Sequence, residues 1–177
     1  MLENVPEVRS KYESGKLRFG TIDSWLAYKL TGKFVTDASN ASRTYLCDLK
    51  KSSWDPTLLR IAKLNENSLP EIVNSFETVG KVKTGELEGV ELCSILGDQQ
   101  SSAYAHNLSV NEMKITYGTG CFLLTNIGPE YSISDSFVTT ILHKNKGKIT
   151  YGLEASVECG GGTLNWAKRL GLFNSYK

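Results

Sequence analysis

Residues 97–100, Gly-Asp-Gln-Gln, hold the side chains of this sequence that are best suited to acid–base chemistry. The apolar run before them predicts a short strand over residues 90–96, and residues 101–108 can continue as a helix. Asp98 would then lie at the carboxyl end of a strand, where α/β proteins commonly place their chemistry. Its carboxylate is a candidate general base for an alcohol; the alternative is a plain N-cap of the helix.

A glycine–threonine turn follows about twenty residues later, between two apolar runs. In Gly118-Thr119-Gly120 the glycines let backbone N–H groups approach an anion, and the threonine hydroxyl adds a donor. The turn is therefore a candidate phosphate site, with an ordinary hairpin turn as the alternative. Phe122 comes directly after it, where it could face the carbon skeleton of a substrate or belong to a strand core.

A run of glycines, residues 160–162, precedes the last predicted helix. Unpaired N–H groups at a helix N-terminus favour an anion, so this run could meet a nucleotide. Alternatively, the glycines simply allow close packing.

The elements that position these residues are predicted to be mainly helices in the first half of the chain and mainly strands in the second half. A polar helix with a turn at Gly15 opens the chain, and Asp55-Pro56 predicts the start of another helix. Between them, residues 21–32 predict a helix capped by Thr21 and ended by Gly32, with a core-facing apolar stripe of Ile22, Trp25, Leu26 and Leu30. We expect all three tryptophans, Trp25, Trp54 and Trp166, to belong to the core.

Strands dominate the second half of the chain. Apolar runs at 113–117, 121–127, 137–142 and 149–153, separated by turn residues, predict an antiparallel meander. A pair of short strands with glycine turns is predicted over residues 76–89. The change from helices to strands suggests a domain boundary near residues 108–112.

Composition excludes several classes of partner. The 177 residues contain 20 Lys and Arg against 19 Asp and Glu, without a basic stripe, which argues against nucleic acid and anionic membrane surfaces. No stretch is long and apolar enough for a membrane span, so a cytoplasmic protein is expected. The four cysteines, Cys47, Cys93, Cys121 and Cys159, are scattered, which predicts reduced apolar side chains rather than disulfides or a zinc site.

Four segments, taken together, resemble the FGGY carbohydrate kinases over nearly the whole chain. They are residues 19–26 (Phe-Gly-Thr-Ile-Asp-Ser-Trp-Leu), 40–44 (Asn-Ala-Ser-Arg-Thr), 97–100 and 117–122 (Tyr-Gly-Thr-Gly-Cys-Phe). The resemblance implies an α/β fold, part of the actin-like, ribonuclease-H-like ATPase fold. Residues 1–110 would be the end of the N-terminal lobe and residues 111–177 the start of the C-terminal lobe.

The resemblance also implies an activity, ATP-dependent phosphorylation of glycerol to glycerol 3-phosphate. Residues 40–44 and the glutamine after Asp98 point to glycerol rather than to xylulose or gluconate. Asp98 matches the base that accepts the proton of the glycerol 3-hydroxyl, Gln99 matches a residue that holds a glycerol hydroxyl, and Phe122 matches an aromatic near the glycerol carbons.

The nucleotide contacts are implied in the same way. Gly118, Thr119 and Gly120 match the turn that contacts the ATP phosphates. Gly161 and Asn165 match two further contacts, although the family usually has glutamine, one methylene longer, in place of Asn165. Mg²⁺ is expected with the nucleotide, held mainly by residues that this chain does not contain.

The resemblance covers only the middle of such a kinase. The chain is expected to begin after the Asp-Gly-Thr phosphate hairpin and the Arg-Glu pair that grips glycerol, and to stop before the loops around the adenosine. Since losing one such donor costs about 10²–10³ in rate, we expect little activity from this chain alone. The alternatives are an inactive fragment or truncated isoform that pairs with a full-length kinase or with itself, and a kinase of another polyol or sugar.

Overall fold

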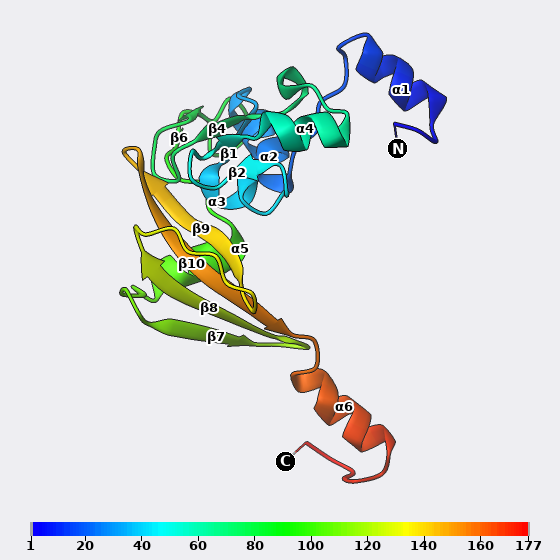
Figure 1. Cartoon of the computed structure of the whole chain (residues 1–177), viewed down its shortest axis with the longest axis vertical. Helices are drawn as coiled ribbons and strands as arrows, with labels where there is room; N and C mark the ends of the chain where they lie inside the picture. Colours follow the sequence, from blue (N-terminus) through cyan, green and yellow to red (C-terminus); the bar gives the residue numbers. More distant parts are fainter. Residues whose placement is uncertain (1, 177) are drawn as a thin grey trace. The chain divides into compact units, whose positions relative to one another are not determined.

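The structure is a computed structural model that describes residues 2–176, and these residues form two compact units. One unit contains the residues up to Gly97 together with His143–Lys148, and the other contains Asp98–Leu142 and the residues from Ile149 onward. Figure 1 shows their helices and strands along the chain. The boundary predicted between the two kinase lobes, after residue 110, concerns family domains rather than compact units and stays a prediction.

The first helix of the first unit, α1 (Pro6–Glu13), is polar, as predicted, and buries none of its side chains. Two ion pairs one turn apart support it, Glu7 with Lys11 and Arg9 with Glu13, both at 2.8 Å between nitrogen and oxygen. All four side chains are mostly exposed, so solvent screens the pairs and they add little to stability.

Helix α2 (Ile22–Thr31) buries a different face from the predicted one. Most of the expected core stripe points outward: Ile22, Trp25 and Leu26 are 71%, 57% and 52% exposed, whereas Leu30 is half-buried. The side chains that this helix buries are smaller, and they are Ser24, Ala27 and Thr31.

Close packing against strand β1 (Val35–Asp37) explains that choice of face. Ala27 and Val35 share a core cluster, and a Cβ added to Gly20 would lie only 2.9 Å from the Cβ of Ser24. Periodicity identifies an apolar stripe on a helix, but not whether a neighbouring element is close enough to demand small side chains. Gly32 ends the helix with φ +76°, as predicted.

A parallel pair of strands, β1 and β4 (Glu71–Val73), forms the centre of this unit, and the short helix α3 (Ala38–Ala41) follows β1 directly. Asp37 at their junction is fully buried. Its carboxylate accepts hydrogen bonds from the N–H groups of Ser39 and Asn40 and from the hydroxyl of Ser75, the last at 2.6 Å.

The other elements of the unit are short: the hairpin β2 (Cys47–Asp48) with β3 (Ser53–Trp54), helix α4 (Pro56–Ala62), the 3₁₀ helix η1 (Glu66–Ser68), and the antiparallel pair β5 (Gly80–Lys81) with β6 (Glu91–Leu92). Asp55 caps α4, as predicted, by accepting hydrogen bonds from the N–H groups of Thr57 and Leu58.

The strand predicted over residues 90–96 is shorter in the structure, because only Glu91–Leu92 pair with another strand. Residues 93–97 form no ladder. The N–H of Ile95 donates instead to the carbonyl of Ser75, and the N–H of Gly97 donates to the hydroxyl of Ser39 at 2.9 Å. An extended segment anchored by separate hydrogen bonds therefore leads to Asp98.

The second unit is built on a four-stranded antiparallel sheet of β7 (Met113–Tyr117), β8 (Cys121–Gly128), β9 (Val138–Asn145) and β10 (Lys148–Val157). The strand order is β7-β8-β10-β9, so the predicted meander is wrong. The connection from β8 to β9 over residues 129–137 is too long for a tight hairpin, and β10 pairs with β8 in place of β9. Gly152 lets β10 lie close to both of its neighbours, since a Cβ there would lie 3.0 Å from the carbonyl oxygen of Thr125 on β8 and 2.8 Å from the Leu142 side chain on β9.

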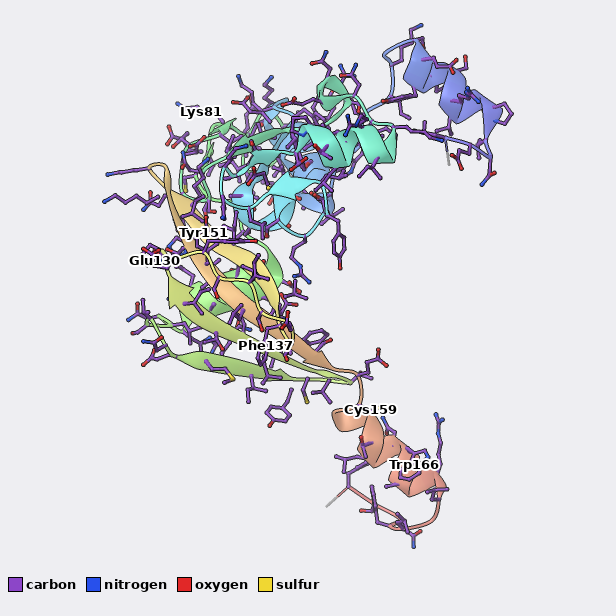
Figure 2. All side chains as sticks on the ribbon, viewed as in Figure 1. Lys81, Glu130, Phe137, Tyr151, Cys159 and Trp166 are labelled. Atoms are coloured by element: carbon purple, nitrogen blue, oxygen red, sulfur yellow. The ribbon has the colours of Figure 1, made fainter. Side chains whose placement is uncertain are left out.

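Helix α5 (Asp98–Ala105) packs on this sheet through a core of Ala103, Leu124 and Leu142. Helix α6 (Gly161–Arg169) follows β10 and starts earlier than predicted, since Gly161 and Gly162 are part of its first turn. No side chain of α6 is buried; Figure 2 places Cys159 just before this helix and Trp166 along it.

The observed burial of the tryptophans and cysteines can be compared with their predicted roles. Trp54 is buried, as predicted, whereas Trp25 and Trp166 are more than half exposed, so their assignment to the core is wrong. All four cysteines are free, but only Cys47 is buried, and burial raises its pKa to about 12. Among the described helices, none combines the length and the apolar character that crossing a bilayer requires.

Candidate functional site

Asp98 is the first residue of α5, and its side chain is exposed. Its Oδ1 accepts a hydrogen bond from the N–H of Gln99 at 2.7 Å, which is a local bond at a helix start. The carboxylate thus satisfies one backbone donor and remains open to solvent. The geometry is compatible with both interpretations of the sequence, a helix cap and a base that meets a ligand.

A polar cluster of Gln99, Lys114 and Thr116 joins the start of α5 to strand β7. The ammonium of Lys114 donates to Oε1 of Gln99 at 2.7 Å and to Oγ1 of Thr116 at 2.9 Å. The Thr116 hydroxyl also donates to Oε1 of Gln99, at 3.2 Å. The Gln99 side chain, unlike that of Asp98, is therefore fixed by the sheet.

Burial and the nearby carboxylates shift the pKa of Lys114 in opposite directions. Burial disfavours its ammonium and holds the pKa of Lys114 below its ordinary value. The carboxylates of Asp98 and Glu154 act against that shift. Glu154 lies on β10 and is 9% exposed, so the cluster has acidic groups on two elements.

One face of the sheet carries this cluster together with Phe122. Directly opposite residues of antiparallel strands point to the same face, and Thr116 pairs with Phe122 while Lys114 pairs with Leu124. Leu124 belongs to the core with Ala103 of α5, which places α5 on that face. The structure thus brings Gln99 and Phe122, which are far apart in sequence, to the same side of one sheet.

The turn Gly118-Thr119-Gly120 joins β7 to β8 and also contacts the start of α6. Within the turn, the N–H of Gly118 donates to the carbonyl of Gly120 at 2.8 Å. The carbonyl of Gly118 accepts from Gly161, and that of Thr119 accepts from Gly160 and Gly162, at 2.8, 2.8 and 3.1 Å respectively. The turn therefore satisfies the first N–H groups of the helix.

Glycines are needed at this junction because the backbones are so close. A Cβ on Gly160 would lie 2.7 Å from Sγ of Cys121, and one on Gly161 would lie 2.9 Å from the carbonyl oxygen of Gly118. Similarly, a Cβ on Gly120 would be 2.9 Å from the carbonyl oxygen of Val157. The sequence suggests two explanations for the glycines at residues 160–162, a nucleotide contact and close packing. These distances directly support close packing.

The apex of the turn keeps donors for an anion. Thr119 is exposed, and within residues 2–176 its N–H, its hydroxyl and the N–H of Gly120 make no hydrogen bond to the chain. Two amides and a hydroxyl next to each other suit a phosphate group.

Asn165 lies on α6, one turn after Gly161, so the two residues share a face of the helix. Its Oδ1 accepts a hydrogen bond from the hydroxyl of Tyr176 at 2.5 Å. The N–H of Gly161 is already bonded to the turn, which leaves its exposed surface, rather than its N–H, for contact with a ligand.

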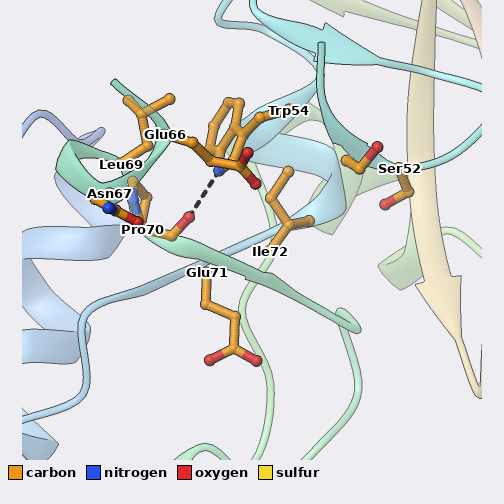
Figure 3. A pocket seen from close by; sticks show the side chains of 9 residues that line it. Ser52, Trp54, Glu66, Asn67, Leu69, Pro70, Glu71 and Ile72 are labelled. Carbon is orange, nitrogen blue, oxygen red and sulfur yellow. Dashed lines mark hydrogen bonds between the residues drawn. The ribbon is translucent and has the colours of Figure 1, made fainter. Parts of the chain in front are cut away.

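A separate pocket in the first unit contains none of the predicted site residues. It has a volume of about 450 Å³ and is lined by residues 52–54, 66–67 and 69–72. In its wall, Nε1 of Trp54 donates to the carbonyl of Pro70 at 2.8 Å (Figure 3). Across the described part of the chain, no group of three His, Cys, Asp or Glu side chains is arranged to hold a metal ion.

Lys114 is the residue of this site that sequence reasoning missed. A lysine and a threonine two positions apart, Lys114 and Thr116, do predict side chains on one face of a strand. That signal is weak, because nothing in the sequence shows that Gln99 lies against that face.

Comparison with known proteins places these observations in a family. The model of the FGGY family of carbohydrate kinases, N-terminal domain, matches residues 1–105. A probable glycerol kinase from Caenorhabditis elegans is 44% identical over 172 residues, which are 95% of this chain and 34% of that protein. The chain therefore spans about a third of the length of this relative.

Solved structures of two carbohydrate kinases are also similar to this chain. The structure of Plasmodium falciparum glycerol kinase with ADP is 33% identical, has a TM-score of 0.92, and is matched over 98% of this chain and 36% of its own. A ligand-bound xylulose kinase from Lactobacillus acidophilus is 25% identical, with a TM-score of 0.78 over 95% of this chain and 34% of its own.

Proposed function

The chain belongs to the FGGY family of carbohydrate kinases, and on this premise we propose that its residues serve the transfer of a phosphoryl group from ATP to glycerol. Its architecture is part of the α/β, actin-like ATPase fold of these kinases, as the resemblance predicted. The reaction, its substrates and its site residues are our proposal for the whole kinase, of which this chain spans about a third.

One observation carries the proposal: the candidate acceptor residues and the candidate phosphate turn lie at the same end of one sheet. Gln99 contacts Thr116 near the end of β7, and the turn begins at Gly118, two residues later. An alcohol held beside residues 98–99 would therefore be near a phosphate held by the turn. In-line phosphoryl transfer requires that proximity more than any covalent chemistry from the protein.

The acceptor side is assigned to Asp98, Gln99 and Phe122. The exposed carboxylate of Asp98 accepts the proton of the glycerol 3-hydroxyl while that oxygen bonds to the γ-phosphorus, and the bond from phosphorus to the ADP oxygen breaks. Gln99 holds a second glycerol hydroxyl through its side-chain amide. Phe122, 40% exposed on the same face as Thr116, contacts the glycerol carbons.

The nucleotide side is assigned to the turn and to α6. The free N–H groups of Thr119 and Gly120, with the Thr119 hydroxyl, hold phosphate oxygens and stabilise their charge. Gly161 and Asn165 are our proposed contacts for the rest of the nucleotide. A ligand contact through Oδ1 of Asn165 would replace the hydrogen bond that this oxygen accepts from Tyr176.

Mg²⁺ is expected with the nucleotide, as in other kinases. The described residues offer it no cluster of ligands, so we assign it none in this chain and derive no step from it.

Glycerol is favoured as the acceptor by the pattern of similarity. Among solved structures, the chain is 33% identical to a glycerol kinase over 98% of its length and 25% identical to a xylulose kinase over 95%. We also place its action in the cytoplasm, where ATP is available. Turnover of a panel of polyols and sugars separates glycerol from the alternative, another acceptor of this family.

The experiment that tests the proposal needs a complete kinase. Residues 1–177 are inserted in place of the matching segment of the Caenorhabditis elegans relative, and glycerol-dependent ADP release is measured. We expect turnover from this chimaera and none from the isolated chain. A chimaera that folds and binds ATP but does not phosphorylate glycerol would overturn the proposal, and turnover by the isolated chain would refute the view that its site is incomplete.

A second candidate function is a non-catalytic partner, and the exposed apolar face of α2 favours it. Ile22, Trp25 and Leu26 form a surface of the kind that binds protein. On this alternative, the chain alone forms an oligomer or binds a full-length kinase, and sedimentation of the chain with and without that kinase tests it.

A further inference from the structure

We propose that Lys114 is a positioning residue that fixes the direction of the Gln99 amide, so that Gln99 donates a hydrogen bond to the substrate. The inference rests on the proposed function, because it assigns a role within the same acceptor site. It adds a residue to that site and a hydrogen-bond direction that the site residues by themselves leave undetermined.

The direction follows from the chemistry of the groups in contact. A lysine ammonium carries only donors, so it can bond to a glutamine side chain only through the amide oxygen. Lys114 meets Oε1 of Gln99 at 2.7 Å, and the hydroxyl of Thr116 reaches the same oxygen at 3.2 Å. With Oε1 occupied by two donors, the NH₂ group of Gln99 is turned away from the sheet and is left for another partner.

Lys114 is itself held firmly enough to impose that direction. Its ammonium also donates to Oγ1 of Thr116, at 2.9 Å, and its stem lies on the sheet face that α5 covers. The acidic side chains that act on it are Asp98 at the start of α5 and Glu154 on β10. The charged ammonium of Lys114 keeps the amide oxygen of Gln99 directed toward the sheet.

The site therefore presents to the substrate a hydrogen-bond donor, on Gln99, next to an acceptor, on Asp98. The carboxylate of Asp98 accepts a hydrogen from one hydroxyl, and the NH₂ group of Gln99 donates to the oxygen of a neighbouring one. This pair fits a vicinal diol, in which one hydroxyl acts as donor and the adjacent one as acceptor. An amide of opposite direction would present two acceptors to the diol and would leave one hydroxyl oxygen without a donor.

The test uses Gln99→Glu and Lys114→Met in the active chimaera, with Lys148→Met, an exposed lysine of the same sheet, as the matched control. Glutamate has the shape of glutamine but cannot donate. We expect kcat/KM for glycerol to fall about 10²-fold in both variants, as for a misplaced substrate, while KM for ATP changes less than about threefold. Lys148→Met should behave as the parent.

Two further variants keep the test informative if Lys114→Met reduces folding. Lys114→Arg retains a side chain with donors only and should recover most of the activity. Thr116→Val removes one donor to Oε1 and should lower kcat/KM for glycerol about fivefold, roughly the value of one hydrogen bond.

The results that would overturn the inference differ from those that would overturn the proposed function. Near-parental activity in Gln99→Glu would mean that Gln99 accepts from the substrate, and near-parental activity in Lys114→Met would remove the positioning role. A parent chimaera that folds without phosphorylating glycerol would instead refute the function itself, and the inference with it.

Discussion

Asp37 and Asp98 both stand at the start of a helix, and their surroundings are opposite. Asp37 is fully buried ahead of α3, and its carboxylate accepts from backbone N–H groups, from the Asn40 amide and from the hydroxyls of Ser39 and Ser75. Asp98 begins α5 exposed, with the N–H of Gln99 bonded to its Oδ1. The same residue type at similar positions therefore holds structure in one unit and faces solvent in the other.

The difference teaches how to separate a cap from a candidate base. A buried carboxylate must have its acceptor sites filled by donors, because an unpaired charge in the interior is costly. Such a group cannot accept a proton from a ligand without breaking its own network. A carboxylate with an exposed edge retains acceptor sites, and those sites are what a base requires.

The largest expected effect is on catalysis, in Asp98→Asn. Asparagine keeps the shape of the side chain but is a very weak base, so kcat of the chimaera should fall by about 10²–10⁴. The free energy of unfolding should change by less than about 1 kcal/mol, because the residue is exposed. ADP release and urea denaturation measure the two quantities. A variant that loses several kcal/mol of stability, roughly, but keeps its turnover would reverse the roles that we give to the two aspartates.

The next effect is on stability, in Asp37→Ala. Removing this carboxylate leaves several buried donors without an acceptor, and we expect a loss of about 3–5 kcal/mol in the free energy of unfolding. Urea denaturation of the chain measures it, with Asp98→Ala as the matched control. A loss below about 1 kcal/mol would show that water or rearranged side chains replace the carboxylate.

Gly160→Ala extends the comparison to the glycine junction of the second unit. Its Cβ would meet Cys121 Sγ at 2.7 Å and the backbone of Gly120 at 3.0 Å, so overpacking should cost about 1–3 kcal/mol. Gly118→Ala is the control, because its Cβ would meet only the Gly120 carbonyl at 3.5 Å, an ordinary contact. Thermal unfolding compares them, and equal stability of the two variants would mean that the junction is looser than the structure shows.

The smallest effect is expected on the exposed face of α2. Leu26→Gln should change the free energy of unfolding by less than about 0.5 kcal/mol, since Leu26 is 52% exposed, whereas Leu59→Ala, at a site 5% exposed, should cost about 2–5 kcal/mol. A large loss in Leu26→Gln that depends on protein concentration would reveal a partner on this face and would favour the non-catalytic alternative.

Local signals predicted the local features of the fold. The Asp55 cap of α4, the end of α2 at Gly32 and the burial of Trp54 each follow from residues close in sequence, and each is confirmed. The family was likewise predicted, because its motifs are short runs in a fixed order, and the comparisons confirm it.

Features that depend on distant residues were not predictable in this way. Whether Ile22 or Ala27 faces the core depends on how closely β1 approaches, and the pairing of β10 with β8 joins segments far apart in the chain. Lys114 becomes part of the site only through its contact with Gln99. The roles of Asp98, Thr119 and Asn165 rest on resemblance and stay predictions.

The hydrogen bonds between the turn at residues 118–120 and the start of α6 have a mechanical consequence. Because there is no room for a side chain between them, the turn and the helix cannot slide past each other and should move as one rigid body. A ligand that shifts Thr119 would then also displace Asn165, so that binding at the turn would move the whole of α6.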